Sequence, residues 1–362
     1  MQIYHTGSLS LFSEQDPLLL ESGTSLAAVQ VAYETYGALH AAGENAILVC
    51  HALTGSAHAA GGDHGNGPGW WEPMIGPGRA LDTRRYFVIC SNILGSCYGT
   101  TGPSSTNPWT GKAYGPSFPA ITVRDMVRVQ KRLLDELGVK RLASVIGSSL
   151  GGMQVLEWAI LYPNFCETII PISVAARQTA WCIALNAAAR AAIRLDPNQG
   201  LAAARMIGMI SYRSPDEFEN RFGRRKKHEF LSHHDPLNVF EVESYLAHQG
   251  RKLVDRFDAE TYVCLSRAMD LHDVTYNRGG LKDVLGGIRA QALCLGVSSD
   301  LRYPFALQRE LAEWIPGACY GEIESIHGHD AFLIEYGQLQ AMVSGFLAET
   351  AAAGYPRAAS WR

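Results

Sequence analysis

The sequence predicts an α/β fold in which a mostly parallel sheet is interrupted by a helical insertion. Short, mostly apolar runs alternate with amphipathic helical patterns, which is typical of a parallel sheet covered by helices. This alternation stops after Val174 and resumes at Ala292, an interval too long for an ordinary loop. With 362 residues and 47% hydrophobic content, the chain can bury a large core, which excludes intrinsic disorder and fibrous repeats.

The predicted strands are compact apolar runs, apart from the first, which alternates apolar and polar residues as a half-buried strand does. They span Leu26–Tyr36, Ala46–Cys50, Tyr86–Cys90, Leu142–Ile146, Thr168–Ile172, Ala292–Val297 and Tyr320–Ile326. Between these runs, Val123–Leu137 gathers its apolar residues broadly on one face and is followed by Gly138, which predicts a helix and its end.

Helical patterns without a strong strand signal fill the interval from about residue 177 to residue 287. They cover Ile183–Arg194, Leu201–Ile210, Asp216–Arg221, Val239–Gln249 and Ala259–Met269. We therefore expect a core domain of residues 1–175 and 288–362 and a helical lid of residues 176–287 inserted into it.

Composition and charge exclude several classes of protein. The chain has 31 Lys and Arg against 35 Asp and Glu, and its basic residues are scattered apart from Arg224–Lys227, so no nucleic-acid partner is expected. No apolar stretch approaches the roughly 18 to 20 residues that cross a bilayer, and the N-terminus lacks a secretory pattern. The eight Cys show no metal-type spacing, which predicts reduced thiols, no metal site and a cytoplasmic location.

The segment Gly147–Gly151 reads Gly-Ser-Ser-Leu-Gly and matches G-x-S-x-G, the nucleophile elbow of α/β-hydrolases. The motif alone is weak, but here the predicted strand Leu142–Ile146 precedes it and a helical pattern, Met153–Leu161, follows it. The structural alternative is a Gly-rich turn that only joins strand to helix. If Ser149 is a nucleophile, it needs a base, an orienting carboxylate and an oxyanion site elsewhere in the chain.

Asp300 and His329 are the candidate carboxylate and base, because each follows a late predicted strand in the chain order of this fold. The carboxylate would accept a hydrogen bond from one imidazole nitrogen, so that the other nitrogen takes the Ser149 proton. A structural alternative for Asp300 is a turn carboxylate that caps its own backbone.

Two neighbouring residues compete for these roles. His327 is an alternative base, but the predicted strand runs directly into it, whereas the following Gly allows a turn that presents His329. Asp330 is an alternative acid, but it adjoins His329 in sequence. We interpret Asp330 as a substrate contact or as a helix N-cap before Ala331–Tyr336.

The segment His51–Gly55 follows the predicted strand Ala46–Cys50, where an α/β-hydrolase supplies its second oxyanion donor. The backbone amides of Leu53 and Leu150 would bind the developing negative charge, each such donor being worth about 2.7 to 4 kcal/mol in the transition state. We interpret His51 itself as a structural hydrogen-bonding residue.

Further segments, spread over nearly the whole chain, form a pattern far more specific than the elbow. They are His51–Gly55, Gly69–Trp71, Ile75–Gly78, Tyr86–Asn92, Gly99–Ser105, Arg124–Met126, Gly151–Gln154, Val242–Tyr245 and Gly328–Phe332. In these segments the chain resembles the homoserine O-acetyltransferases of methionine biosynthesis, which belong to the α/β-hydrolase superfamily. It departs from that family at the elbow, where Ser148 replaces a Gly and Leu150 replaces a Met.

The resemblance implies a site. Ser149, Asp300 and His329 would be the catalytic triad. Arg205 and Tyr212 would bind substrate from the lid, with the Arg205 guanidinium on the amino-acid carboxylate and Asp330 on the substrate ammonium. Without the resemblance, Arg205 would be interpreted as a solvated residue of an amphipathic helix.

The resemblance also implies ping-pong transfer of an acetyl group from acetyl-CoA to L-homoserine, with no permanently bound cofactor and with a homodimer as the assembly. Succinyl-CoA as donor and L-serine as acceptor are alternatives with the same chemistry. No Lys or Arg adjoins the elbow to pair a succinyl carboxylate, and the small Ala52 and Gly55 leave room for the longer acceptor. A plain esterase is a second class, and a non-catalytic binding protein, which would lack a complete triad, is a third.

Overall fold

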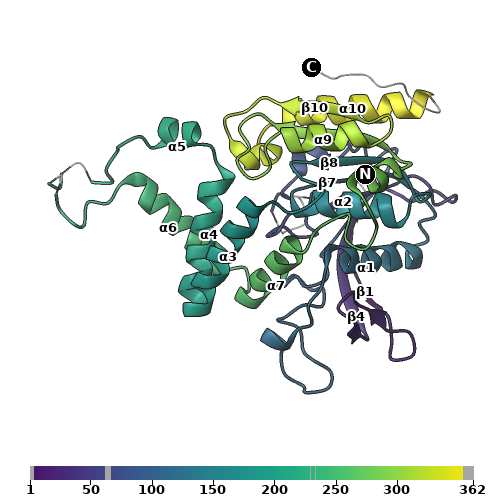
Figure 1. The fold of residues 1–362 in the computed structure, drawn as a ribbon, viewed down its shortest axis with the longest axis horizontal. Coiled ribbons are helices and arrows are strands. Elements are labelled where there is room, and N and C mark those ends of the chain that lie inside the picture. The colour runs from purple at the N-terminus through teal and green to yellow at the C-terminus, as the bar shows by residue number, and fades with distance from the viewer. Residues whose placement is uncertain (1–3, 62–66, 229, 233, 354–362) are drawn as a thin grey trace.

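The computed structural model describes residues 4–61, 67–228, 230–232 and 234–353, which form a sheet covered by helices (Figure 1). The sheet has eight strands in the order β1-β4-β6-β5-β7-β8-β9-β10. Their bounds, in that order, are Tyr4–Leu11, Val29–Tyr36, Phe87–Ser91, Ala46–Cys50, Leu142–Ser148, Cys166–Ile172, Gln291–Val297 and Cys319–Ile323. The strands from β6 to β10 pair in parallel, and β4 and β1 add antiparallel at one edge, which confirms the predicted mostly parallel sheet.

The sheet separates two apolar cores. Side chains alternate across β5, so Leu48 belongs to the same core as Leu133 and Leu156, while Ile47 belongs to the other core with Val343. Because both faces are covered, the central strands are apolar throughout, and this explains why the sequence located Ala46–Cys50 with its observed bounds.

Two predicted strands differ from the structure in extent, and one observed strand was not predicted. The predicted strand 26–36 is split, because Ala28 has a φ of 53° and leaves Leu26 in a two-stranded ribbon of β2 (Leu18–Leu19) and β3 (Ser25–Leu26). The predicted strand 320–326 ends at Ile323, where its register with β9 also ends. Strand β1 was missed, because its Thr, Gly and Ser residues are largely exposed and give no apolar alternation.

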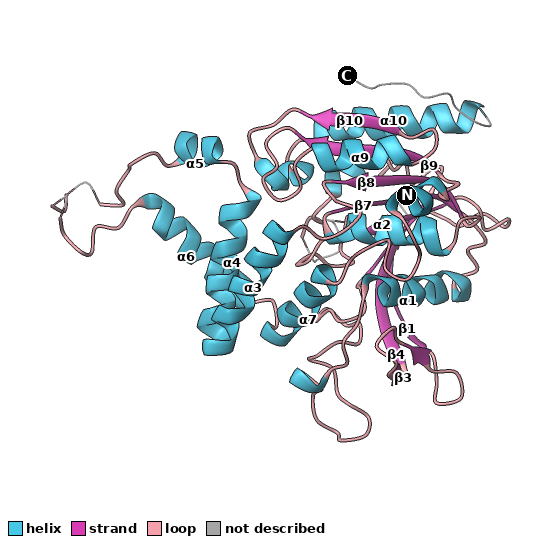
Figure 2. Ribbon diagram, viewed as in Figure 1, coloured by secondary structure: helices cyan, strands magenta, loops and turns pink. Residues whose placement is uncertain are grey.

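Helices pack on the sheet, most of them between successive strands and α10 after the last strand (Figure 2). They are α1 (Val123–Glu136), α2 (Leu150–Leu161), α9 (Ala306–Trp314) and α10 (Tyr336–Ala353), with short 3-10 turns η2 (Glu72–Met74), η3 (Gly115–Ser117) and η4 (Gly328–Leu333). Helix α1 begins with a capping box, in which the Thr122 side chain accepts from the Asp125 amide and the Asp125 carboxylate accepts from the Thr122 amide. Within the described residues, no helix is long and apolar enough to span a membrane.

Further helices follow β8 and precede β9, and Figure 2 shows α3 to α7 gathered beside the sheet. They are α3 (Ala180–Leu195), α4 (Pro197–Tyr212), α5 (Pro215–Arg221), α6 (Glu241–Val254), α7 (Ala259–Asp270) and α8 (Leu281–Gly286). Helix α3 packs on α4 and α7, α4 also packs on α6, and α8 packs on α9. A separate lid domain with boundaries at residues 176 and 287 stays a prediction.

Candidate active site

Ser149 lies at the sharp turn between β7 and α2. Its backbone has φ 57° and ψ −122°, a region that a residue with a side chain rarely adopts. Such strain costs about 1 to 3 kcal/mol and persists only where the surroundings hold it. Here the Ser149 amide donates to the carbonyl of Ile172 at 3.0 Å, which ties the turn to the end of β8.

The Gly residues of this turn are required by close packing against the end of β5. A Cβ on Gly151 would lie 2.1 Å from the carbonyl oxygen of Cys50, and one on Gly147 would lie 2.7 Å from the backbone of Gly151. No side chain fits at either position. The turn therefore sits directly beside the segment that begins at His51.

His329 and Asp300 meet in the buried interior, although 29 positions separate them in the chain. His329 Nδ1 lies 2.7 Å from Asp300 Oδ2. The other carboxylate oxygen, Oδ1, accepts from the amides of Arg302 at 2.8 Å and Tyr303 at 3.0 Å. Asp300 thus caps its own turn and orients His329 at the same time, so the two alternatives raised by the sequence are both present.

The fixed carboxylate selects one tautomer of His329. Because Asp300 accepts from Nδ1, a neutral ring carries its proton there and leaves Nε2 as the basic nitrogen. The rings of Tyr303 and Phe332 pack around the imidazole, with centroid distances of 5.4 and 5.6 Å. These contacts hold the plane of the ring.

The turn that carries His329 is short and is set by Gly328. This Gly has a φ of 63°, and a Cβ on it would lie 2.8 Å from the carbonyl oxygen of Tyr212. The prediction that a Gly turn presents His329 is therefore confirmed. The alternative interpretation of Asp330 as a helix N-cap is wrong, because Asp330 lies inside η4 and α10 begins only at Tyr336.

His327, the alternative base, faces a different carboxylate. Its Nδ1 lies 3.3 Å from Glu217 Oε2 of α5, and its side chain is 31% exposed. The structure pairs His329, and not His327, with Asp300.

His51 joins the same region through hydrogen bonds to backbone. Its Nδ1 lies 2.8 Å from the Ala52 carbonyl oxygen, and its Nε2 accepts from the Ile93 amide at 3.3 Å. Burial lowers the pKa of His51 to about 4, so the ring is neutral at pH 7. This arrangement agrees with the structural role expected for it.

The two predicted oxyanion donors occupy suitable backbone positions. Leu150 is the first residue of α2, where an amide has no carbonyl partner within the helix and lies at the positive end of the helix dipole. Leu53 lies in a tight turn in which the Gly55 amide donates to the Ala52 carbonyl at 2.9 Å. Their roles stay predictions.

A cavity of about 190 Å³ brings together most of the predicted site. It is lined by Ala52, Leu53, Thr54, Gly55, Trp70, Arg205, Tyr212, Arg256, His329, Asp330, Phe332 and Leu333. Ser149, Leu150 and Asp300 are not on this lining and are 5%, 0% and 4% exposed. Asp300 reaches the cavity only through His329.

Arg205 and Tyr212 both come from α4, as the spacing of seven residues in one helix allows. The guanidinium carbon of Arg205 lies 5.7 Å from the centroid of the Tyr212 ring, and that ring lies 5.9 Å from the His329 ring. Helix α4 therefore supplies a cation and a phenol to the cavity that His329 also lines.

Asp330 is held by a residue that the sequence did not single out. Arg213 Nε lies 3.3 Å from Asp330 Oδ2, and Arg213 Nη1 donates to Glu217 at 2.9 Å. Burial raises the pKa of Asp330, while the nearby Arg213 opposes the shift. Arg213 immediately follows the predicted Tyr212, but no motif in the sequence marked it.

Trp70 and Arg256 also line the cavity without having been predicted. Trp70 lies in one of the segments that carry the family resemblance, and its indole donates to the Ser56 carbonyl at 2.8 Å. Arg256 lies in the loop between α6 and α7, where nothing in the sequence distinguishes it from a solvated cation.

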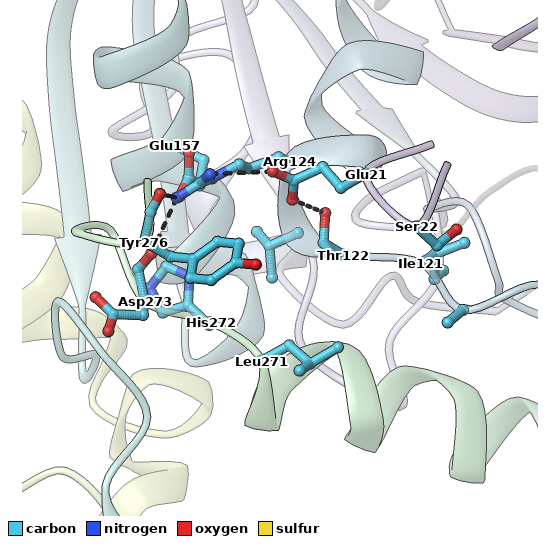
Figure 3. Close-up of a pocket in the computed structure, with 12 residues that line it drawn as sticks. Glu21, Ser22, Ile121, Thr122, Arg124, Glu157, Leu271, His272, Asp273 and Tyr276 are labelled. Carbon is cyan, nitrogen blue, oxygen red and sulfur yellow. Dashed lines mark hydrogen bonds and ion pairs between the residues drawn. The ribbon is translucent and has the colours of Figure 1, made fainter. Parts of the chain in front are cut away.

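A larger cavity, of about 260 Å³, lies between the start of α1 and the segment after α7 (Figure 3). Arg124 lines this cavity and donates to the carboxylates of Glu21 and Glu157. It also donates to the backbone carbonyls of Asp273 and Tyr276. This guanidinium is fully engaged. It ties the chain returning from α7 to the core, which gives the segment Arg124–Met126 a structural role.

Comparison with known proteins defines the class first. A family described as "alpha/beta hydrolase fold" matches residues 45–204. With the observed sheet and the turn at Ser149, this match makes the chain a member of the α/β-hydrolase class.

Closer relatives then define the family. A homoserine O-acetyltransferase of Moorella thermoacetica is 53% identical, over 92% of this chain and 94% of that relative. The crystal structure of a homoserine O-acetyltransferase from Bacillus anthracis is 30% identical with a TM-score of 0.88, over 96% of this chain and 98% of the other. The chain belongs to the homoserine O-acetyltransferase family and is an acyltransferase enzyme.

The same architecture also occurs in a protein described by a different activity. The crystal structure of an esterase is 30% identical with a TM-score of 0.85, over 96% of this chain and all of the other. The fold therefore does not by itself separate acyl transfer from ester hydrolysis.

Proposed function

We propose that this enzyme transfers an acetyl group from acetyl-CoA to the side-chain hydroxyl of L-homoserine, giving O-acetyl-L-homoserine for methionine biosynthesis. The observation that carries this proposal is the 2.7 Å hydrogen bond from His329 to Asp300 at a cavity that Leu53 and Arg205 also line. The family to which the chain belongs supports the choice of acetyl donor and homoserine acceptor. Acetyl-CoA is a co-substrate, and no cofactor is held permanently.

In the first half-reaction, His329 Nε2 takes the proton of the Ser149 hydroxyl as the Ser149 oxygen bonds to the thioester carbon. The amides of Leu53 and Leu150 bind the oxyanion that forms. The C–S bond then breaks, the CoA sulfur takes the proton from His329, and the acetyl group remains on Ser149 as an ester. Asp300 keeps the imidazole in one orientation and stabilises its charged form.

In the second half-reaction, the hydroxyl of L-homoserine gives its proton to His329 as its oxygen bonds to the acetyl carbon. The second oxyanion collapses, the bond to Ser149 breaks, and Ser149 takes the proton back. One acetyl group has moved and the free enzyme is restored.

Charged side chains around the cavity suit an amino-acid acceptor. We assign the substrate carboxylate to Arg205, whose planar guanidinium binds carboxylates with two parallel hydrogen bonds. We assign the ammonium to Asp330, which holds only Arg213 as its ion-pair partner among the described side chains. The Tyr212 ring lies close to both the Arg205 guanidinium and the His329 ring.

Transfer of the acetyl group from Ser149 to homoserine must be faster than its hydrolysis, because attack by water would release acetate. Helix α4 lines part of the cavity with Arg205 and Tyr212. We propose that residues 176–287 act as a lid that orients the acceptor and limits the access of water.

We also propose that two copies of the chain form a homodimer. Trp181 and Ile210, from α3 and α4, are 56% and 55% exposed, and they line an apolar groove with Leu301, which is 44% exposed. A second copy would cover this apolar surface.

Detection of the acetyl-enzyme tests the mechanism. In rapid-quench experiments with acetyl-CoA alone, we expect a burst of CoA equal to the enzyme concentration and an acetyl group on Ser149 by peptide mass spectrometry. Ser149→Ala should abolish both. Ser144→Ala is a matched control, since it removes another buried hydroxyl, one without a partner among the described residues. Equal turnover by wild type and Ser149→Ala would refute the mechanism.

Kinetic measurements on the same enzyme distinguish the alternative acyl donors, the alternative acceptors and the esterase activity. We expect acetyl-CoA to be preferred over succinyl-CoA, and L-homoserine over L-serine, in side-by-side kinetics. A plain esterase, which the architecture also permits, would release acetate at the same rate with and without homoserine. If homoserine lowers the release of acetate and O-acetyl-L-homoserine forms instead, the enzyme is not a plain esterase.

A further inference from the structure

The amide of Leu53 is oriented by a chain of two peptide planes. A peptide is planar and trans, so its carbonyl and its N–H point in opposite directions. The Ala52 carbonyl, which shares a peptide with the Leu53 amide, accepts from His51 Nδ1 at 2.8 Å and from the Gly55 amide at 2.9 Å. These two donors on one side of the peptide direct the Leu53 N–H to the other side.

The second plane is the peptide between Thr54 and Gly55. Its N–H is the Gly55 donor to Ala52, and its carbonyl is that of Thr54. Arg256 Nη1 donates to this Thr54 carbonyl at 2.9 Å. A hydrogen bond on the Thr54 oxygen polarises the peptide and strengthens the bond that the Gly55 amide makes.

Arg256 comes from the helical segment between β8 and β9, 202 positions away from Thr54. Its backbone is held at the end of α6, where the Arg256 amide donates to the Leu253 carbonyl at 3.0 Å. The next residue, Phe257, is 7% exposed and packs edge to face on Tyr98 with centroids 5.8 Å apart. This packing places the Tyr98 hydroxyl 2.5 Å from Arg256 Nη1.

We infer that Arg256 is a positioning residue for the oxyanion donor at Leu53. It acts through the carbonyl of Thr54 and the amide of Gly55, so that the loop after α6 aligns the amide that binds the transition-state charge. The inference rests on the proposed function, because it requires an acyl group that develops negative charge beside Leu53. By this inference, a cationic side chain outside the elbow helps to align the groups that stabilise the transition state.

A different role for the same residue makes a different prediction. Arg256 is exposed and lines the cavity, and the alternative role for its charge is direct binding of the phosphates of CoA. A positioning residue affects every acetyl donor equally, whereas a phosphate-binding residue affects only donors that carry phosphate. The small ester p-nitrophenyl acetate, which has no phosphate, separates the two roles.

The test measures the rate constant and the half-saturating concentration for acetylation of Ser149, with acetyl-CoA and with p-nitrophenyl acetate. We expect Arg256→Ala to lower the rate constant about tenfold to hundredfold with both donors, since misaligning an oxyanion donor costs less than removing it. The half-saturating concentration of acetyl-CoA should stay within about twofold, because binding of the ground state is not affected. Arg256→Lys, which keeps one donor, should recover part of the rate.

Two further variants, together with thermal unfolding, distinguish a loss of positioning from a loss of folded protein. Tyr98→Phe leaves Arg256 in place but removes its second partner, and it should cause a smaller loss that is again equal for both donors. Arg251→Ala removes an exposed cation from the last turn of α6 and should match wild type. Thermal unfolding of each variant shows that the fold is retained.

The outcomes divide clearly. An unchanged rate in Arg256→Ala, or a loss confined to acetyl-CoA and seen in its half-saturating concentration, overturns the positioning role. If wild-type enzyme itself forms no acetyl-Ser149, the proposed function fails and the inference fails with it. If wild type is acetylated and Arg256→Ala behaves identically, only the inference fails.

Discussion

Asp300 contacts His329 with only one of its carboxylate oxygens, and the other oxygen is held by two backbone amides. An Asn at position 300 can keep the amide contacts through its own oxygen, but it presents an NH₂ group to His329. The imidazole then accepts at Nδ1 and carries its proton on Nε2, which is the wrong tautomer for a base.

We therefore expect Asp300→Asn to lower kcat by about 10³- to 10⁴-fold while the fold is retained. Stopped-flow measurement of the CoA burst checks the rate, and thermal unfolding checks the fold. A variant with full activity would show that Asp300 only caps its turn.

Asp330→Asn tests the acceptor site separately from the acyl donor. Loss of one charged partner of the ammonium should raise KM for L-homoserine about 10- to 100-fold, the range expected for a charge-assisted hydrogen bond. The CoA burst measured without homoserine should change little, because the first half-reaction does not use the ammonium site. A burst reduced as strongly as the overall rate would place Asp330 in acyl transfer instead.

Glu157 is 1% exposed and lies beside Arg124 in Figure 3. It accepts from two cations, Arg124 at 3.2 Å and Arg278 at 2.7 Å. Glu157→Gln keeps the shape but leaves two guanidinium groups facing a neutral amide, which should cost about 3 kcal/mol of unfolding free energy. Asp135→Asn is the control, because its ion pair with Lys131 is on the surface and is worth at most about 0.5 kcal/mol. Urea unfolding measures both, and similar values for the two variants would contradict the prediction.

Two buried His residues predict acid sensitivity. Burial lowers the pKa of both His51 and His272 from the ordinary value of 6.5 to about 4. Below pH 6.5 the unfolded chain binds protons that the folded chain excludes, so the unfolding free energy falls as the pH drops from about 6.5 to about 4. Each His contributes about 3 kcal/mol to this loss.

His272→Gln removes one of these groups and should make the decline over this pH range shallower. Urea unfolding of wild type and variant at pH 7 and pH 5 measures the difference. Identical slopes in the two proteins would mean that folding does not lower the pKa of His272.

Much of the fold could be predicted because local patterns matched local structure. Strand Ala46–Cys50 is apolar on both faces, and α1 has one apolar face and a clear end at Gly138. The misses are equally local. Strand β1 carries small polar residues because one side faces solvent, and the prediction of an unbroken strand from Leu26 did not account for the turn at Ala28.

In the candidate site too, the residues that could be predicted are those with a local sequence signal. Ser149 is marked by Gly neighbours that packing requires, and His329 is marked by the Gly before it, so the sequence could locate both. Arg213 and Arg256 carry no such mark. They are ordinary cations in sequence, and they matter only because folding places them against Asp330 and Thr54.

From residues alone one can read the family, the strained turn at Ser149 and the order in which acid and base follow it. The partners of each side chain were decided by the tertiary structure. In the tertiary structure Asp300 contacts His329 rather than His327. One Asp300 oxygen contacts the imidazole and the other accepts from backbone amides. Arg256 donates to the Thr54 carbonyl. The physical reason is that parallel strands end at one edge of the sheet, so residues far apart in the chain converge there at distances that no local pattern encodes.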